Sequence, residues 1–189
     1  MTEHVPTTEQ RLREVTIGEP QQLNAPIELA EYDPEWPRLF EREATRIRAA
    51  LGDRALVVEH VGSTAVPGLA AKPIIDVVLI VADSSDESSY VPDLAAAGYV
   101  LRIREPDWFE HRVLKGPDTN VNLHVFSRGC DEADRMRVFR DHLRANEDDR
   151  GRYADAKREL AAQEWKYVQH YADAKSAVVA EIMTRATST

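Results

Sequence analysis

The sequence has almost no cysteine and no long apolar run, and both shortages limit what the protein can be. Cys130 is the one cysteine among 189 residues, which excludes a disulfide framework or a thiolate zinc cluster within the chain. No run of about 18 apolar residues occurs, so no membrane helix is expected. The first ten residues lack the basic and apolar regions of a secretory signal. We therefore expect a cytoplasmic protein without a membrane partner.

Basic residues are fewer than acidic ones, and the difference varies along the chain. The chain has 33 acidic residues against 24 Lys and Arg, a net charge of −9, which argues against general nucleic-acid binding. Residues 130–189 are nearly balanced, with 12 acidic and 11 basic side chains. We expect this segment to contribute a locally basic cleft, suited to a small anionic ligand, to an otherwise acidic surface.

The order of the expected elements indicates an α/β or α+β fold. Residues 1–25 are polar and predict a poorly ordered leader, with a short helix over 8–15 as the alternative; residues 26–189 form a single domain. Helices are predicted over 35–51, 88–97, 131–145, 150–163 and 170–186. Strands are predicted over 27–29, 55–61, 73–82, 99–104, 110–115 and 121–127. The expected architecture is a mixed β-sheet flanked by helices, with a C-terminal helical segment.

Residues 60–76, HVGSTAVPGLAAKPIID, concentrate the groups that suit ligand binding. Gly62 permits close backbone approach, and the hydroxyls of Ser63 and Thr64 with nearby amides can hold phosphate oxygens. Lys72 supplies a compensating positive charge. Asp76 lies in an otherwise apolar strand, where an unpaired carboxylate is costly, so it needs a partner or a metal ion. A tight turn punctuated by Gly and Pro is the alternative interpretation.

This segment resembles the hallmark segment of the GrpB family, also called UPF0157. Further matches are YDPEWP at 32–37, NLHVF at 122–126 and FRDHLR at 139–144, followed by Tyr153 and Lys157. The resemblance covers about residues 27–186. It implies a fold of the nucleotidyltransferase-like superfamily of polymerase β type, and family members also occur fused to dephospho-coenzyme A kinase. The activity of the family is largely undefined.

The metal site implied by this superfamily is altered in the present sequence. Nucleotidyltransferases place two carboxylates two residues apart on one strand, so that both face the same side and hold two metal ions. Val78 stands where the second carboxylate would follow Asp76. We expect His60, Asp76 and His124 to converge as catalytic and metal-binding residues, a set that suits Zn²⁺, Mn²⁺ or Fe²⁺ better than Mg²⁺. The histidines can instead serve as acid–base groups or order the sheet as buried hydrogen-bonding residues.

Basic side chains from the C-terminal half are expected to complete the site. Arg137, Arg140 and Arg144 share one face of the helix over 131–145, and Arg forks bind phosphate or carboxylate in a bidentate manner. The resemblance favours Arg140 and Arg144 over Arg137. Expected members of the same pocket are also Arg112, Tyr153 and Lys157. A solvated, salt-bridged helical face is the alternative.

The expected function is binding of a nucleotide such as ATP, or of another phosphorylated or carboxylated small molecule, with a divalent metal (Mg²⁺, Mn²⁺ or Zn²⁺). As an enzyme the protein is expected to catalyse metal-dependent nucleotidyl or phosphoryl transfer, or ATP-dependent activation of a carboxylate. The alternative is a non-catalytic ligand-binding or accessory domain that has lost the two-metal site, and Val78 favours it.

Overall fold

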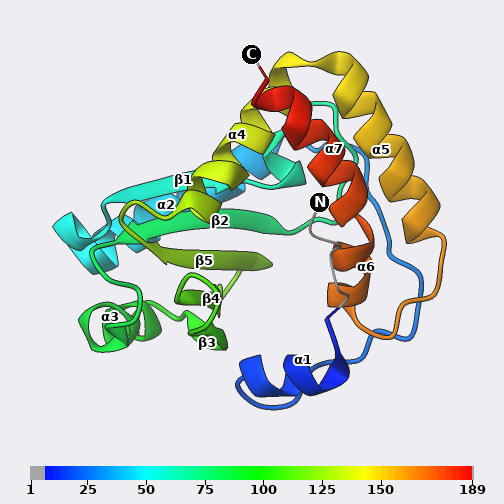
Figure 1. Cartoon of the computed structure of the whole chain (residues 1–189). Coiled ribbons are helices and arrows are strands. Elements are labelled where there is room, and N and C mark those ends of the chain that lie inside the picture. Colours follow the sequence, from blue (N-terminus) through cyan, green and yellow to red (C-terminus); the bar gives the residue numbers. More distant parts are fainter. Residues whose placement is uncertain (1–6, 189) are drawn as a thin grey trace.

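Five short segments form one mixed sheet. The computed structural model describes residues 7–188. The strands are β1 (Val57–Val61), β2 (Ile75–Val81), β3 (Val100–Glu105), β4 (His111–Lys115) and β5 (Val121–Ser127), in the spatial order β1-β2-β5-β4-β3 (Figure 1). Only β2 and β5 run parallel. Strand β2 is central and is buried on both faces except at Asp76, as its apolar composition predicts.

The register decides which face each polar side chain occupies. His60 lies opposite Val77, whereas Asp76 lies opposite Asn122. Since successive residues of a strand point to opposite faces, His60 and Asp76 project from opposite sides of the sheet. We call the side that carries Val77 the α2 face and the side that carries Asp76 the polar face.

Helices cover both faces unequally. Helices α2 (Trp36–Leu51) and α3 (Val91–Ala96) pack their apolar stripes on the α2 face and bury the larger core. Helix α4 (Asp131–Ala145) covers the β1 side of the polar face, where Val61, Val78 and Phe126 form a smaller core. Helices α5 (Glu147–Ala161), α6 (Val168–Ala174) and α7 (Ser176–Ala186) lie together at one end of the sheet (Figure 1). Three short 3₁₀ turns occupy Gly52–Arg54, Ser63–Ala65 and Glu87–Ser89.

The predicted fold class, a mixed sheet flanked by helices with a C-terminal helical segment, is confirmed. Two predicted elements are wrong. The single helix over 170–186 is two helices that meet at Lys175. The strand over 27–29 is absent, and isolated bridges at Ala25 and Ala30 flank that segment instead.

The first six residues of the predicted leader lie outside the described residues. From Thr7 onward the segment contains helix α1 (Glu9–Val15), which is the alternative offered by the sequence. Leu12 and Val15 are buried, and Thr16 forms a bridge with Ile103 of β3. This part of the leader is therefore packed on the outer strand of the sheet. None of the helices in the described part of the chain is both long and apolar enough to cross a lipid bilayer.

Candidate functional site

A glycine lets the loop after β1 close onto the polar face. Gly62 has a φ of +70°, and a Cβ built on it would lie 2.5 Å from Oδ2 of Asp76. A side chain at this position is therefore excluded both by backbone conformation and by space. The chain then enters the turn Ser63–Ala65, which brings Ser63 toward helix α5.

Asp76 is held by two side chains of the neighbouring strand. Asn122 Nδ2 donates to Asp76 Oδ1 at 2.8 Å, and His124 Nε2 lies 3.4 Å from the same oxygen. Burial alone would raise the pKa of the Asp76 carboxyl, but the contacts with His124 and Asn122 and the charge of Lys72 outweigh it and lower the pKa. Asp76 is therefore an ionised carboxylate.

His111 and Glu105 extend the contact between Asp76 and His124 across the sheet. His124 Nδ1 lies 3.0 Å from Nε2 of His111, and His111 Nδ1 lies 2.7 Å from Oε2 of Glu105. Burial lowers the pKa of His111 to about 4 despite the Glu105 contact, so this imidazole is neutral at pH 7. The chain of contacts fixes the orientation of His124 toward Asp76.

Three lysines, Lys72, Lys115 and Lys175, face Asp76, and a fourth, Lys157, lies beside Lys72 and Lys175; we call the four the lysine cluster. The pKa of each is lowered, with burial as the largest cause. The charge of Asp76 counteracts this decrease for all of them except Lys157. One carboxylate thus faces an excess of positive charge.

The cluster divides into two paired and two unpaired lysines. Lys115 donates to Asn122 Oδ1, and Lys157 donates to the Ser63 hydroxyl and to the carbonyl of Ala70. Within residues 7–188, neither Lys72 nor Lys175 has a hydrogen bond or an ion pair at Nζ.

The two unpaired ammonium groups lie 5.5 and 4.6 Å from the centroid of the Tyr171 ring. Burial together with the charges of Lys175 and Lys115 lowers the pKa of Lys72 to about 8, although Asp76 counteracts them. An anionic group placed between Lys72 and Lys175 would remove this repulsion.

His60 does not join Asp76, so the predicted convergence of His60, Asp76 and His124 is wrong. The His60 ring stacks on Phe40 of α2, with 4.9 Å between the ring centroids. Its Nε2 lies 3.0 Å from Thr64 Oγ1, which in turn donates to the carbonyl of Ile74. Because that hydroxyl proton is already used, Nε2 of His60 must be the donor. Burial lowers the pKa of His60 to about 4, so the ring stays neutral.

Thr64 and Arg112 are likewise not parts of an anion site. The Thr64 hydroxyl is buried and fully engaged with His60 and Ile74. Arg112 lies opposite Val125, on the α2 face, and its Nε donates to Glu87 at 2.6 Å. It is buried there as a link between β4 and the turn before α3. The structure therefore does not bring these two predicted phosphate-binding residues to Asp76.

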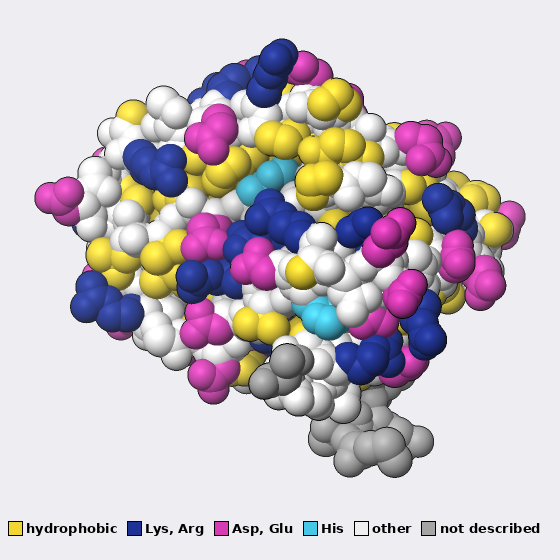
Figure 2. Space-filling model, turned by 90° about the horizontal axis from the view of Figure 1, so that it is seen from above, with side chains coloured by type: hydrophobic (Ala, Val, Ile, Leu, Met, Phe, Trp, Pro, Cys, Tyr) yellow, Lys and Arg dark blue, Asp and Glu magenta, His cyan; other side chains and the backbone are white. Residues whose placement is uncertain are grey.

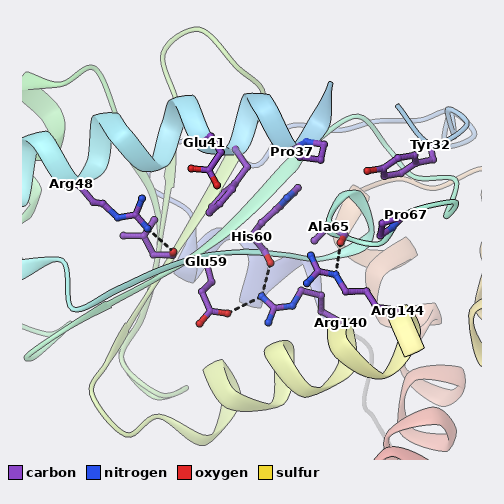
Figure 3. Close-up of a pocket in the computed structure, with 12 residues that line it drawn as sticks. Tyr32, Pro37, Glu41, Arg48, Glu59, His60, Ala65, Pro67, Arg140 and Arg144 are labelled. Atoms are coloured by element: carbon purple, nitrogen blue, oxygen red, sulfur yellow. Dashed lines mark hydrogen bonds and ion pairs between the residues drawn. The ribbon is translucent and has the colours of Figure 1, made fainter. Parts of the chain in front are cut away.

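A groove of about 470 Å³ separates α2 from α4 along the outer side of β1 (Figure 3). Arg140 reaches it from α4, but its guanidinium is occupied: it donates to Glu59, to the carbonyl of His60 and to Asp141. Arg144 Nε donates to the carbonyl of Ala65 at 2.8 Å, and the rest of its guanidinium is more exposed. Arg140 and Arg144 fasten α4 to β1 and to the loop. The polar face carries more unpaired charge and is the stronger candidate site.

Tyr153 and Lys157 contact the loop, as the sequence predicts for a shared pocket. Lys157 Nζ is 3.0 Å from Ser63 Oγ and lies over the Tyr153 ring. Burial raises the pKa of Tyr153 to about 12, and the nearby Ser63 hydroxyl counteracts part of that increase. Residues far apart in sequence thus meet at Ser63.

The residues around Asp76 do not fit a two-metal centre. Val78, two residues along β2, supplies no ligand, and Asn122 donates its amide N–H to the carboxylate. Within residues 7–188, no three His, Cys, Asp or Glu side chains are grouped so that they could hold a metal ion. The lysines that face Asp76 also oppose the approach of a cation.

The sequence interpretation missed Lys115 and Lys175. Lys175 follows Tyr171 by four residues and precedes Ile182 by seven, so it lies on the apolar stripe of the C-terminal helices. A lysine on such a stripe is the signal that could have identified it. Lys115 had no such signal, because the end of a hairpin strand ordinarily carries polar residues.

The outer surface is not uniformly basic. Figure 2 shows dark blue and magenta side chains interspersed over the face seen from above, with a group of dark blue side chains beside a histidine near its centre. Charges of both signs are thus interspersed on that face.

A family profile and two similar proteins point to the same family. The profile described as "GrpB protein" matches residues 26–185. A UPF0157 protein of Halalkalibacterium halodurans is 66% identical over 97% of this chain and 94% of its own length. A UPF0157 protein of Streptomyces coelicolor is 47% identical over 90% of this chain and 88% of its own.

Solved structures and a longer relative extend the comparison. The crystal structure of conserved protein GrpB from Enterococcus faecalis aligns with a TM-score of 0.74 at 31% identity, covering 84% of this chain and 96% of that one. A dephospho-CoA kinase of Mycolicibacterium paratuberculosis is 32% identical over 71% of this chain, but the match spans only 39% of that protein. An alignment with Cid1 in complex with a UTP analogue has a TM-score of 0.38 at 14% identity, which is too low to carry weight.

Proposed function

The chain belongs to the GrpB family, and from this membership and the geometry of its polar face we propose that it binds a small anionic molecule at Lys72 and Lys175. The observation that carries the proposal is the pair of ammonium groups without a partner at Nζ in the described part of the chain, beside a single carboxylate. Both lysines are half-buried, and an unpaired charge that is partly removed from water destabilises a fold. A ligand that supplies the missing negative charge removes that cost.

The ligand is a phosphorylated or carboxylated small molecule, and a nucleotide such as ATP is the first to test. Phosphate and carboxylate oxygens accept charge-assisted hydrogen bonds from ammonium groups. Ser63 lies beside the cluster through its contact with Lys157 and adds a hydroxyl to the same place. The site therefore offers two positive charges and a neutral hydrogen-bonding group.

The function is binding rather than two-metal transfer. The metal-dependent nucleotidyl or phosphoryl transfer and the ATP-dependent carboxylate activation expected from the resemblance need ligands that β2 and β5 do not provide, since Val78 and Asn122 stand at those positions. The match to part of a dephospho-CoA kinase agrees with an accessory domain attached to a separate enzyme. A divalent metal, where present, is not required for the anion to bind.

Thermal unfolding with ATP, inorganic triphosphate or phosphate tests this function. In EDTA, at least one of these anions should raise Tm, because a ligand at about 100 times its Kd stabilises the native state by about 2.7 kcal/mol. Lys72→Gln and Lys175→Gln should each abolish most of the shift. The matched control is Lys166→Gln, since Lys166 is an exposed lysine paired with Glu9.

Two results would contradict the proposal. One is the absence of a shift with every anion, with or without Mg²⁺, Mn²⁺ or Zn²⁺. The other is a shift that survives in both Lys72→Gln and Lys175→Gln. A shift that appears only with metal and disappears in Asp76→Ala would replace the proposed function with the metal-dependent one.

A further inference from the structure

The contact between Ser63 and Lys157 has chemical features that anion binding does not use. Lys157 Nζ lies 3.0 Å from Ser63 Oγ, and its other acceptor is the carbonyl of Ala70. Lys157 is 2% exposed, whereas Ser63 is half-buried. The Tyr153 ring lies beside the amine, with its centroid 5.0 Å from Lys157 Nζ.

The surroundings of Lys157 favour its neutral amine. Its partners are a hydroxyl, a carbonyl and the Tyr153 ring, none of which carries negative charge at pH 7. Burial first, and then the charges of Lys175, Arg158 and Lys72, lower the pKa of Lys157 to about 7. A neutral amine can donate one N–H to the Ala70 carbonyl and accept the Ser63 proton with its lone pair.

The backbone presents Ser63 at a sharp bend. Gly62 ends β1 with φ +70° and ψ −173°, a conformation that glycine adopts readily, and the next residue starts a 3₁₀ turn. The serine therefore projects from a fixed corner between the sheet and α5. A hydroxyl held next to a buried amine is the arrangement by which a lysine activates a serine nucleophile.

We propose that Ser63 is a nucleophile and Lys157 its general base, acting on a carboxylic ester or thioester. Ser63 would touch the substrate carbonyl, and Lys157 would act on the Ser63 proton. Lys72 and Lys175 lie nearby, so a substrate that carries a phosphate or carboxylate group is the natural class. That choice of class rests on the proposed function, whereas the serine–lysine pair does not.

The reaction balances with water as the second reactant. The Ser63 proton moves to Lys157 Nζ as Oγ bonds to the carbonyl carbon, and collapse of the tetrahedral adduct breaks the bond to the alcohol or thiol, which leaves with the proton from Lys157. Water then gives a proton to Lys157 and attacks the acyl-Ser63 ester. The products are the free acid and the regenerated serine, whose Oγ recovers the proton.

Labelling with diisopropyl fluorophosphate tests the pair on the full chain. The Ser63 Oγ–P bond forms, the P–F bond breaks, fluoride leaves and the proton passes to Lys157. Intact-mass measurement should show one adduct, and peptide mapping should place it on Ser63. The labelling rate of the native protein should rise with pH through about 7, where Lys157 loses its proton.

Variants separate the pair from ordinary surface reactivity. Ser63→Ala should abolish the adduct, and Lys157→Arg, which stays protonated and so cannot act as a base near pH 7, should slow labelling roughly 100-fold or more. Ser85→Ala is the control, because the Ser85 hydroxyl donates to a carboxylate, Asp83, and has no lysine as its partner. Circular dichroism should verify folding of each variant.

Several results would overturn the proposal: no adduct on Ser63, a pH-independent rate in the native protein, or equal rates in folded Lys157→Arg and the native chain. The pH profile needs no variant, so the test survives a variant that fails to fold. The probe is uncharged and does not need Lys72 or Lys175. Labelling without an anion-induced Tm shift would therefore remove the proposed function alone, and the reverse result would remove this inference alone.

Discussion

The polar residues on the two faces of the sheet differ in how completely they are paired. On the α2 face, His60, Thr64 and the Ile74 carbonyl form a closed series in which each contact has one donor and one acceptor. On the polar face, Lys72 and Lys175 bring positive charge to Asp76 without a hydrogen bond at Nζ in the described part of the chain. A closed hydrogen-bond network stabilises the fold, whereas an unpaired charged side chain indicates a position where a ligand is expected to bind.

The loop after β1 links these two faces, and its first residue should be the most sensitive. Gly62→Ala introduces a Cβ at positive φ and places it 2.5 Å from the Asp76 carboxylate. The conformational and steric costs together should lower the free energy of unfolding by about 3 kcal/mol or more. Urea denaturation measures this loss.

Gly68→Ala is the matched control for that substitution. Gly68 also has positive φ, +78°, but an added Cβ would meet no atom within 4 Å. It should therefore lose only the conformational part, about 1–2 kcal/mol. Equal losses for the two variants would show that the close approach of Gly62 to Asp76 does not matter.

A smaller effect is expected from opening the closed network. Thr64→Val keeps the shape of the side chain but removes the hydroxyl that joins His60 to the Ile74 carbonyl. The buried His60 ring and the partly buried Ile74 carbonyl lose their partner, which should cost about 1–3 kcal/mol in urea denaturation. The Tm shift caused by the anion should remain unchanged. Loss of that shift would place Thr64 in the ligand site and erase the distinction between the faces.

Most of the fold could be predicted from the spacing of apolar residues and from the Gly and Pro residues of turns. The central strand was recognisable because it is apolar at every position except Asp76, and the hairpin of β4 and β5 because a Gly-Pro-Asp turn separates two apolar runs. The predicted start of α5 lies three residues late, because Asn146 caps the helix by accepting from the Asp149 amide and the helix begins at Glu147. The boundary between α6 and α7 at Lys175 could not be predicted, because the helical spacing of apolar residues continues from one helix into the next.

The site was harder to predict because it depends on register and on distant contacts. A one-residue shift turns a strand side chain to the other face, and this is why His60 and Arg112 were wrongly grouped with Asp76. The contact between Lys157 and Ser63 could be predicted from the sequence, since the resemblance to the GrpB family places both residues in one pocket. Lys175 was missed because only the packing of α6 and α7 brings it to Asp76.

The charge of Asp76 offers the most direct test of the claim that lysines, and not a metal ion on Asp76, hold the ligand. Phosphate binding should be measured by calorimetry in EDTA for the native chain and for Asp76→Asn, once urea denaturation shows that the variant is folded. Removing the negative charge beside Lys72 and Lys175 should tighten binding about fivefold, corresponding to roughly 1 kcal/mol of relieved repulsion. Loss of binding in Asp76→Asn, or binding by the native chain only when a divalent metal is added, would contradict the account.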